Sequence, residues 1–335
     1  MSEERLPILA PPAPAGTEPS SEGPRFSVVI ATYEAADTVA DSIDSALRQT
    51  YPPHEIIVVD DGSKDDVRGA LEPFGDKIVA IHKPNGGGAS ALNAGIAAAT
   101  GDFLAILDSD DAYHPHRLEV LADLARERPD LDLITTDAKF VVKDEGVGTF
   151  ATYNPFAVAD QRTAIFESCF VGGWPAIRLS RLRQIGGFDE SLRTGYDWDC
   201  WARLLLDGSQ AGLVEEPYYE YKLHPGSLTG SRASSLWDRV TLLEKAAANP
   251  GLRAQERPLL KRQLRMHRSR AVAAEAQSVL YGSAPKGPLL RLAAAKGIDL
   301  RARLAAVLAV VAPPLARRLV PEDRPPEERL PAAAS

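Results

Sequence analysis

The sequence predicts an α/β protein built on a mainly parallel, doubly wound sheet with flanking helices, followed by a C-terminal helical extension. Short apolar runs rich in Val and Ile alternate with segments of helical period between Phe26 and Leu107. This alternation favours parallel strands joined by crossover helices that cover the sheet. Polar residues follow each apolar run at its carboxyl end, which is where ligands bind on sheets of this type. Both observations therefore indicate one architecture and one functional edge.

Four strands and three helices account for the first part of this pattern. The strands are short β-branched or aromatic runs, and they are predicted at 26–31, 55–60, 77–82 and 103–107. The helices between them are predicted at 37–48, 65–74 and 88–99. In the first helix, Val39, Ile43 and Leu47 recur at helical spacing. A helix over 117–126 and a strand over 131–136 are expected next, and 139–162 shows poor periodicity.

The chain is expected to divide near residue 232, where the pattern becomes helical. The N-terminal stretch is rich in Pro and Glu and lacks the charged start and apolar core of a signal peptide. Long helical stretches are predicted near 236–248 and 252–282. The expected parts are a disordered leader over 1–24, the α/β domain over 25–232, a helical C-terminal region over 233–322 and a disordered tail over 323–335.

Composition and charge exclude several functional classes. The net charge of −8 argues against general nucleic-acid binding, because no excess of cations exists to displace counterions. Cys169 and Cys200 are the only cysteines and form no C-x-x-C pair. Neither a disulfide framework nor a structural zinc site is therefore expected, and a reducing cytoplasmic setting fits.

An apolar segment over 304–316 lies between basic residues. The flanking cations are Arg301, Arg303, Arg317 and Arg318. The segment is too short to cross a bilayer, which takes about 20 apolar residues, and the Pro313-Pro314 pair breaks the helical pattern. We expect such a helix to lie on an anionic membrane surface. The alternatives are packing on the protein's own core or in a homodimer.

Three carboxylates, those of Asp108, Asp110 and Asp111, follow the predicted strand at 103–107. So much negative charge at the end of a buried strand is costly unless a cation neutralises it. Asp108 and Asp110 are two residues apart, so they point to the same side while the strand continues. Hard oxygen ligands of this kind suit Mg²⁺ or Mn²⁺ holding a diphosphate. The alternative is a solvated acidic turn.

The loops after the first two strands suit a nucleotide. Tyr33 offers a ring face for stacking on a base, and Asp61 offers an acceptor for a base N–H. Their alternatives are ordinary packing and helix capping, respectively. The glycines at 86–88 either lend backbone N–H groups to a phosphate or form a plain turn. No G-x-G-x-x-G follows the first strand, which excludes a Rossmann dehydrogenase.

A second acidic site lies at 195–204, where Asp197 and Asp199 open a predicted helix that also carries Trp198. A carboxylate beside aromatic surface is suited to take a proton from a hydroxyl. The alternatives are stabilisation of the helix dipole by the carboxylates and a core position for the indole. His224 stands alone in a turn, where it is either structural or a ligand to a transition metal or a phosphate.

Eight motifs in this order resemble the family 2 glycosyltransferases, which have a GT-A fold, from about Phe26 to Thr229. The motifs are Ser27-Val-Val-Ile-Ala-Thr-Tyr33, Ser45-Ala-Leu-Arg-Gln-Thr-Tyr51, Val58-Val-Asp-Asp-Gly-Ser63, Asn85-Gly-Gly, Asn93-Ala-Gly-Ile96, Leu107-Asp-Ser-Asp-Asp111, Ile185-Gly-Gly-Phe-Asp-Glu190 and Asp197-Trp-Asp. The resemblance implies transfer of a sugar from a nucleoside diphosphate, usually UDP, with inversion at the anomeric carbon.

The resemblance also implies roles for individual residues. Tyr33 and Asp61 would hold the uracil, the Thr32–Glu34 loop would lie beside the nucleotide, and Asp108 would contact the ribose or diphosphate. Asp110 and Asp111 would be the metal-site carboxylates, with Asp110 the first choice of direct ligand, and His224 would lie near the metal and diphosphate. Asp197 would be the catalytic base.

Two residues depart from the family pattern. Tyr196 replaces the Glu of the usual Glu-Asp pair, so Asp199 remains a rival base. Leu92 stands before Asn93, where the family often has Arg, so one polar contact is missing.

The acceptor or sugar pocket is expected to include Gly173, Trp174, Trp198 and Asp199. A saccharide or lipid-linked acceptor in bacterial polysaccharide, cell-envelope or glycoconjugate synthesis fits, with the enzyme in the cytoplasm or at the inner face of the membrane. Two other functions stay open. A sugar nucleotidyltransferase would need a Gly-rich basic loop where this chain has Thr32-Tyr33-Glu34. A non-catalytic sugar-binding module would lack one of the two acidic sites.

Overall fold

The computed structural model describes residues 7–12, 14, 23–142, 145–223, 232–281 and 286–319. The chain forms two compact units, which divide between His224 and Pro225. The sequence placed this boundary near 232.

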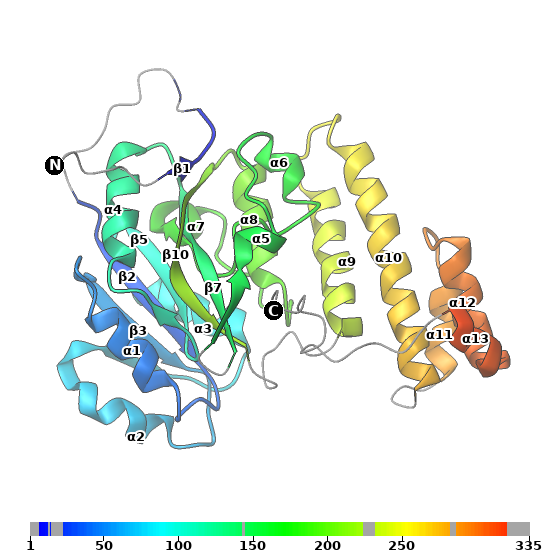
Figure 1. The fold of residues 1–335 in the computed structure, drawn as a ribbon, viewed down its shortest axis with the longest axis horizontal. Coiled ribbons are helices and arrows are strands. Elements are labelled where there is room, and N and C mark those ends of the chain that lie inside the picture. The colour runs from blue at the N-terminus through cyan, green and yellow to red at the C-terminus, as the bar shows by residue number, and fades with distance from the viewer. Residues whose placement is uncertain are drawn as a thin grey trace. The chain divides into compact units, whose positions relative to one another are not determined.

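The first unit contains a mixed sheet with the strand order β1-β10-β7-β9-β5-β2-β3-β4 (Figure 1). These strands are β1 (Ile8–Leu9), β2 (Phe26–Thr32), β3 (Glu55–Asp60), β4 (Val79–His82), β5 (Phe103–Asp108), β7 (Leu133–Val142), β9 (Ala176–Arg178) and β10 (Ala211–Lys222). Two further strands pair off this path, β6 (Ala112–Tyr113) with β10 and β8 (Glu145–Thr149) with β7.

The central strands β5, β2, β3 and β4 are all parallel, as the alternating pattern predicts. Antiparallel pairing enters through β9, which lies between β5 and β7. The predicted α/β class with flanking helices is confirmed, and the sheet as a whole is mixed.

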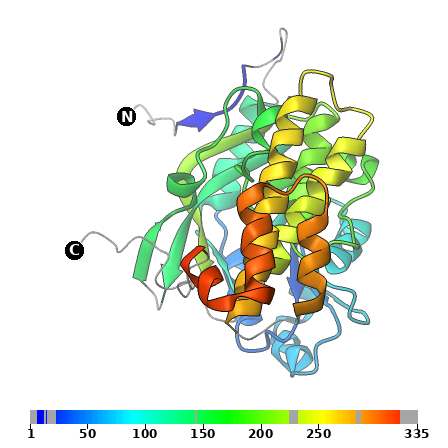
Figure 2. The same ribbon diagram turned by 90° about the vertical axis from the view of Figure 1, so that its right-hand side faces the viewer.

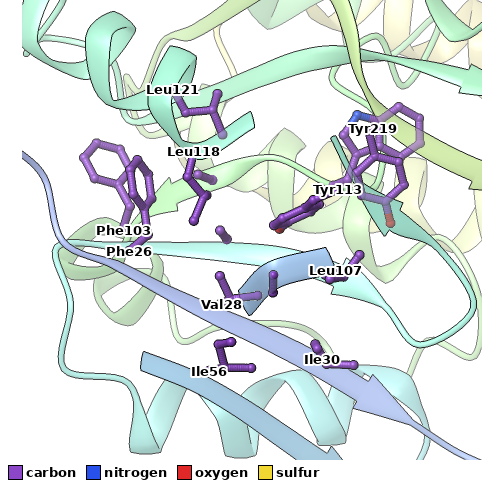
Figure 3. Close-up of a cluster of buried hydrophobic side chains, with 14 of the residues drawn as sticks. Phe26, Val28, Ile30, Ile56, Phe103, Leu107, Tyr113, Leu118, Leu121 and Tyr219 are labelled. Atoms are coloured by element: carbon purple, nitrogen blue, oxygen red, sulfur yellow. The ribbon is translucent and has the colours of Figure 1, made fainter. Parts of the chain in front are cut away.

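Helices flank the sheet in the described part of the first unit. They are α1 (Val39–Leu47), α2 (Val67–Leu71), α3 (Gly88–Ala98), α4 (Arg117–Glu127), α5 (Phe150–Tyr153), α6 (Gln161–Ala164), α7 (Leu179–Gln184) and α8 (Tyr196–Leu206), with a 3-10 turn at Glu72–Lys77. Along β2, Val28 and Ile30 join a core cluster with Leu118 of α4 (Figure 3). Val29 points the other way, since a Cβ built on Gly95 of α3 would lie 2.4 Å from its Cγ1. Successive side chains of β2 are therefore buried on opposite faces of the sheet, as a doubly wound sheet with helices on both faces requires.

Two predictions made from the sequence differ from the structure. The leader over 1–24 is not wholly irregular, because Ile8 and Leu9 pair with Leu213 and Val214 at the edge of the sheet. Backbone hydrogen bonding to an edge strand is a tertiary contact that composition does not reveal. The strand predicted at 131–136 is longer than expected, since β7 runs from Leu133 to Val142 and pairs with β8. The tail over 323–335 lies outside the described residues.

The second unit is helical. Its helices are α9 (Arg232–Ala248), α10 (Arg257–Leu280), α11 (Lys286–Ala294), α12 (Leu300–Val311) and α13 (Pro313–Leu319). Helices α9 and α10 pack on each other, and α12 packs on α10, α11 and α13 (Figure 2). None of the described helices has the length and apolar character needed to cross a membrane.

We expect the second unit to lose stability as the pH falls from about 6.5 toward 4. His267 on α10 is 2% exposed, and neither ring nitrogen has a hydrogen-bond partner among the described residues. Burial, together with the charges of Arg239 and Arg270, lowers the pKa of His267 to about 4. The unfolded chain therefore binds a proton at a higher pH than the folded one, which favours unfolding by about 2 kcal/mol at pH 5.

Denaturant unfolding at pH 7 and pH 5 tests this expectation. The variant His267→Leu should lose that part of the pH dependence, and the other titrating groups act equally on both proteins. Identical pH dependence in the two proteins would contradict the assignment.

Candidate active site

The carboxyl ends of the central strands bring the predicted polar residues to one edge of the sheet. Ala31 pairs with Asp108, Thr32 pairs with Asp60, and Asp60 pairs with His82. Asp60 accepts hydrogen bonds from His82 Nδ1 at 3.0 Å and the Ser63 N–H at 2.9 Å. Burial alone would raise the pKa of Asp60, but these hydrogen bonds outweigh it and hold the pKa below its usual value. Asp60 thus shapes the turn that presents Asp61.

The loop after β2 is tied to the loop after β3. The Glu34 N–H donates to Ser63 Oγ at 3.0 Å, and the Lys64 N–H donates to Glu34 Oε1 at 2.7 Å. Glu34 has a φ of 53°, an uncommon conformation for a residue other than glycine. Tyr33 is 48% exposed, so its ring is accessible. Thr32 is buried, which leaves its side chain no open surface for a nucleotide.

Asp61 is buried and anchors the glycine loop. It accepts hydrogen bonds from Lys83 Nζ at 2.5 Å and from the backbone N–H groups of Gly86 and Gly87. Two of the glycine N–H groups that the sequence offered to a phosphate are therefore bound to Asp61. A carboxylate has about four acceptor positions, so three donors leave about one for a further N–H group.

The acidic cluster after β5 has two parts with different surroundings. Burial, with the negative charges of Asp110 and Asp197, raises the pKa of Asp108 to about 7. Asp111 is buried, and its two oxygens accept hydrogen bonds from Tyr219 Oη at 2.8 Å and the Lys222 N–H at 2.8 Å. Burial and the charges of Asp108 and Asp110 also raise the pKa of Asp111 well above its usual value. Asp111 therefore connects the acidic turn after β5, residues 108–111, to β10.

A buried cation supports this junction from the core side. The Arg117 guanidinium lies 5.1 Å from the ring centroid of Tyr219 and 4.8 Å from that of Tyr113. It donates hydrogen bonds to Thr136 Oγ1 and the Trp174 carbonyl. Burial lowers the pKa of Arg117. The Arg117–Tyr219–Asp111 chain links the core to the acidic cluster.

Helix α8 brings the second acidic site to the first. Its N-cap Gly195 has a φ of 70°, a left-handed conformation that glycine adopts without strain. Asp197 lies in the first helical turn, and its charge acts on Asp108. A Cβ built on Gly173 would lie 3.4 Å from Asp197 Oδ2, so the structure brings these two predicted residues together.

Asp199, the rival base, is committed to an ion pair. It is 3% exposed and accepts a hydrogen bond from Arg203 Nε at 2.7 Å, one helical turn away. Arg203 also donates to the Ile185 carbonyl. The carboxylate of Asp199 is therefore committed to a structural contact within α8.

The two predicted pocket tryptophans are core residues. Trp174 is 3% exposed and donates from Nε1 to the Thr136 carbonyl, and Trp198 is 6% exposed and donates to the Ile165 carbonyl. Trp174 also stacks on Tyr219, with ring centroids 4.9 Å apart. The expectation that these rings present a face to a sugar is therefore wrong, because burial and hydrogen bonding use both of them in the interior.

We expect Gly88→Ala to destabilise the first unit by about 1–3 kcal/mol, because overpacking forces buried groups apart. A Cβ on Gly88 would lie 2.5 Å from Tyr196 Oη. Burial and the charges of Asp108 and Asp197 raise the pKa of that hydroxyl, which keeps it neutral. Adding Tyr196→Phe removes the clashing atom and should restore part of the loss.

Thermal unfolding of the two single variants and the double variant measures this coupling. Tyr196→Phe alone is the control. Additive effects of the two substitutions would contradict the contact.

The donor chemistry of the cluster fits a divalent cation. Asp108, Asp110 and Asp197 are carboxylates whose mutual repulsion is already felt at Asp108, and hard oxygen ligands suit Mg²⁺ or Mn²⁺. Within the described ranges, no three His, Cys, Asp or Glu side chains are grouped as a ready-made metal site. His224, the remaining predicted ligand, lies outside the described residues.

Three residues of this site were missed from the sequence. Tyr219 and Tyr221 alternate on β10, and burial with the four Asp charges around it raises the pKa of Tyr221. The run Tyr218-Tyr219-Glu220-Tyr221 is a strand signal that could have located them. Lys83 had no local signal, because its partner Asp61 lies 22 residues earlier.

The chain is similar to known glycosyltransferases. The family model described as glycosyl transferase family 2 matches residues 27–185. An uncharacterized glycosyltransferase of Rickettsia typhi is 33% identical over 223 residues, which covers 64% of this chain and 68% of that protein. The uncharacterized glycosyltransferase YwdF of Bacillus subtilis is 32% identical over 187 residues, covering 55% of this chain and 69% of that protein.

Solved structures share the fold at lower identity. S. aureus TarS 1-349 in complex with UDP-GlcNAc superposes with a TM-score of 0.62 at 20% identity, covering 88% of this chain and 89% of that one. The mannosyltransferase PcManGT from Pyrobaculum calidifontis, in complex with GDP-Man and Mn2+, has a TM-score of 0.55 at 20% identity, covering 92% and 91%.

Proposed function

The chain belongs to glycosyl transferase family 2 and is a glycosyltransferase, and we propose that it transfers a sugar from a UDP-sugar to an acceptor hydroxyl with inversion at the anomeric carbon. The observation that carries the proposal is the approach of the second acidic site to the first: a Cβ on Gly173 would lie 3.4 Å from Asp197 Oδ2, and the charge of Asp197 acts on Asp108. Two acidic groups from distant parts of the chain thus lie near each other at the carboxyl ends of the central strands. Asp108 suits the diphosphate side of a donor, and Asp197 suits the acceptor side.

Asp197 is the proposed general base. It would take the proton of the acceptor hydroxyl as the oxygen attacks the anomeric carbon from the face opposite the diphosphate. A single displacement of this kind turns an α-linked donor into a β-linked product. The ion pair of Asp199 with Arg203 supports the choice of Asp197.

The proposed cofactor is Mg²⁺ or Mn²⁺. Asp110 is the first choice of ligand, with Asp108 and Asp111 beside it, and His224 is the proposed further ligand. When bound, such a cation supplies charge stabilisation for the departing diphosphate. Both oxygens of Asp111 already accept hydrogen bonds from β10, which counts against Asp111 as the direct ligand.

The proposed nucleotide site lies on the loops after β2 and β3. Asp61 is the proposed acceptor for the N3–H of uracil, and the exposed ring of Tyr33 suits stacking on the base. The loop bearing Thr32 and Glu34 would lie beside the nucleotide. Binding of UDP and UDP-GlcNAc by TarS is consistent with a uridine donor.

Gly173 marks the proposed acceptor side, since a Cβ there would lie 3.4 Å from Asp197 Oδ2. We propose a saccharide or lipid-linked acceptor in bacterial polysaccharide or cell-envelope synthesis. The relatives named above are bacterial, and this supports only the bacterial part of the proposal.

Calorimetric titration with UDP and GDP, each with and without Mn²⁺, tests the nucleotide and metal assignments. We expect metal-dependent binding of UDP alone. If neither UDP nor GDP binds, with or without Mn²⁺, the nucleotide assignment is refuted. Screening UDP-sugars for hydrolysis then identifies the donor, and proton NMR of the released sugar gives the anomeric configuration.

A further inference from the structure

Helices α12 and α13 expose five large aliphatic side chains. They are Leu300 at 81% exposed, Leu304 at 48%, Val307 at 39%, Val311 at 67% and Leu315 at 53%. Steps of three and four residues place those on α12 along one side of the helix. We call these five residues the aliphatic stripe.

The opposite side of α12 already holds the helix in the unit. Ala302, Ala305, Ala306 and Ala309 are buried in the second unit's core cluster, and Ala316 of α13 joins them. The small residues therefore face inward, and the large aliphatic ones face solvent. An amphipathic helix normally turns its large apolar side chains toward the core and its polar side chains toward solvent. Exposed apolar side chains gathered on one face of a helix mark an interaction site.

The surroundings of the stripe are strongly basic. Residues 286–319 contain seven Lys or Arg and a single Asp, in a chain whose net charge is −8. Arg301 lies in the first turn of α12, and Arg317 and Arg318 lie at the end of α13, all exposed. Two of the cations also make contacts inside the unit. The Arg303 guanidinium donates to the carbonyls of Ala293, Ala295 and Ile298, and Arg317 donates to the Leu280 carbonyl at 3.4 Å.

We propose that the aliphatic stripe and its flanking cations bind the surface of an anionic phospholipid membrane. The apolar side chains would enter the boundary between headgroups and acyl chains, and the cations would meet the phosphates. A second copy of the chain fits less well, because two such faces brought together would oppose cation to cation. This inference does not depend on the sugar or nucleotide that the enzyme uses.

Vesicle sedimentation of the full chain tests the proposal. We expect the protein to sediment with vesicles of phosphatidylcholine and phosphatidylglycerol in equal parts, to remain free with phosphatidylcholine alone, and to be released by high salt. The double variant Leu304→Gln/Val311→Gln should bind the mixed vesicles at least tenfold more weakly. Removing cations by Arg301→Gln or Arg318→Gln should weaken binding about fivefold each.

The matched control is Val79→Gln on β4. Val79 is a 46% exposed aliphatic residue of the first unit. Its substitution therefore lowers the apolar character of the surface and leaves the aliphatic stripe unchanged. It should bind vesicles like the unmodified protein. Circular dichroism and UDP titration check that the stripe variants remain folded and that their nucleotide site is intact.

Two results would overturn the proposal. One is equal binding of the stripe variant and Val79→Gln to the mixed vesicles. The other is a stable dimer in solution, measured by light scattering without vesicles, that the stripe variant dissociates. The second result would assign the stripe to a second copy of the chain.

Discussion

Asp197→Asn is expected to lower kcat for sugar transfer by about 10²–10⁴-fold, the usual contribution of a positioned general base. The amide has the size of the carboxylate but accepts no proton from the acceptor hydroxyl. UDP binding should persist, because the proposed nucleotide contacts lie on the loops after β2 and β3. Initial rates at saturating donor and acceptor, with UDP affinity measured on the same preparation, check both parts.

Asp199→Asn is the matched control for that variant. It removes the same charge two residues away, but Asp199 is buried and paired with Arg203. Losing a partner leaves Arg203 uncompensated, and because that side chain is partly exposed we expect a stability loss of about 1–3 kcal/mol. The folded fraction should keep most of its turnover. Full turnover in Asp197→Asn would contradict the assignment of Asp197 as the base. Loss of turnover in a stable Asp199→Asn would make Asp199 the base instead.

Asp110→Asn is expected to weaken Mn²⁺-dependent UDP binding by about 100-fold or more, since charge stabilisation by a bound metal contributes several kcal/mol. Removing the metal with a chelator from the unmodified protein should reproduce this loss. The variant should then show no further loss with chelator, because the metal contribution has already been removed. Calorimetric titrations in Mn²⁺ and in chelator measure all four cases.

Asp111→Asn separates metal binding from support of the turn. Its carboxylate joins the acidic turn to Tyr219 and to the Lys222 backbone on β10. We expect a lower melting temperature and a smaller effect on metal-dependent UDP binding than in Asp110→Asn. An equal loss of binding with unchanged stability would make Asp111 the direct ligand.

The sequence predicted well wherever the signal is local. The parallel core followed from β-branched runs that alternate with helical period, and β3 was predicted with the bounds that the structure has. Prediction failed where a segment depends on a distant partner. Ile8 and Leu9 become a strand only because β10 offers an edge, and neither local composition nor periodicity indicates that pairing.

The tryptophans show a second limit. Trp174 and Trp198 lie beside candidate site residues in the chain, and an indole suits both a sugar face and a core. The carbonyl groups of Thr136 and Ile165 accept the indole N–H groups in the interior and so hold both rings in the core. They lie 38 and 33 residues away in the chain. Sequence proximity to a site thus does not give side-chain direction.

The sequence by itself determined the α/β class, the edge of the sheet where the polar loops gather, and the acidic character of both sites, because strand period and strand ends are local properties. Only the tertiary structure decided which carboxylates are committed to structural contacts. Asp199 is held by a guanidinium one helical turn away, and Asp111 is held by a backbone N–H 111 residues along the chain. Whether a carboxylate is available for chemistry depends on the donors that folding brings to it. The donors that hold Asp199 and Asp111 in structural contacts count against these two carboxylates, and Asp197 and Asp110 remain the proposed base and the proposed metal ligand.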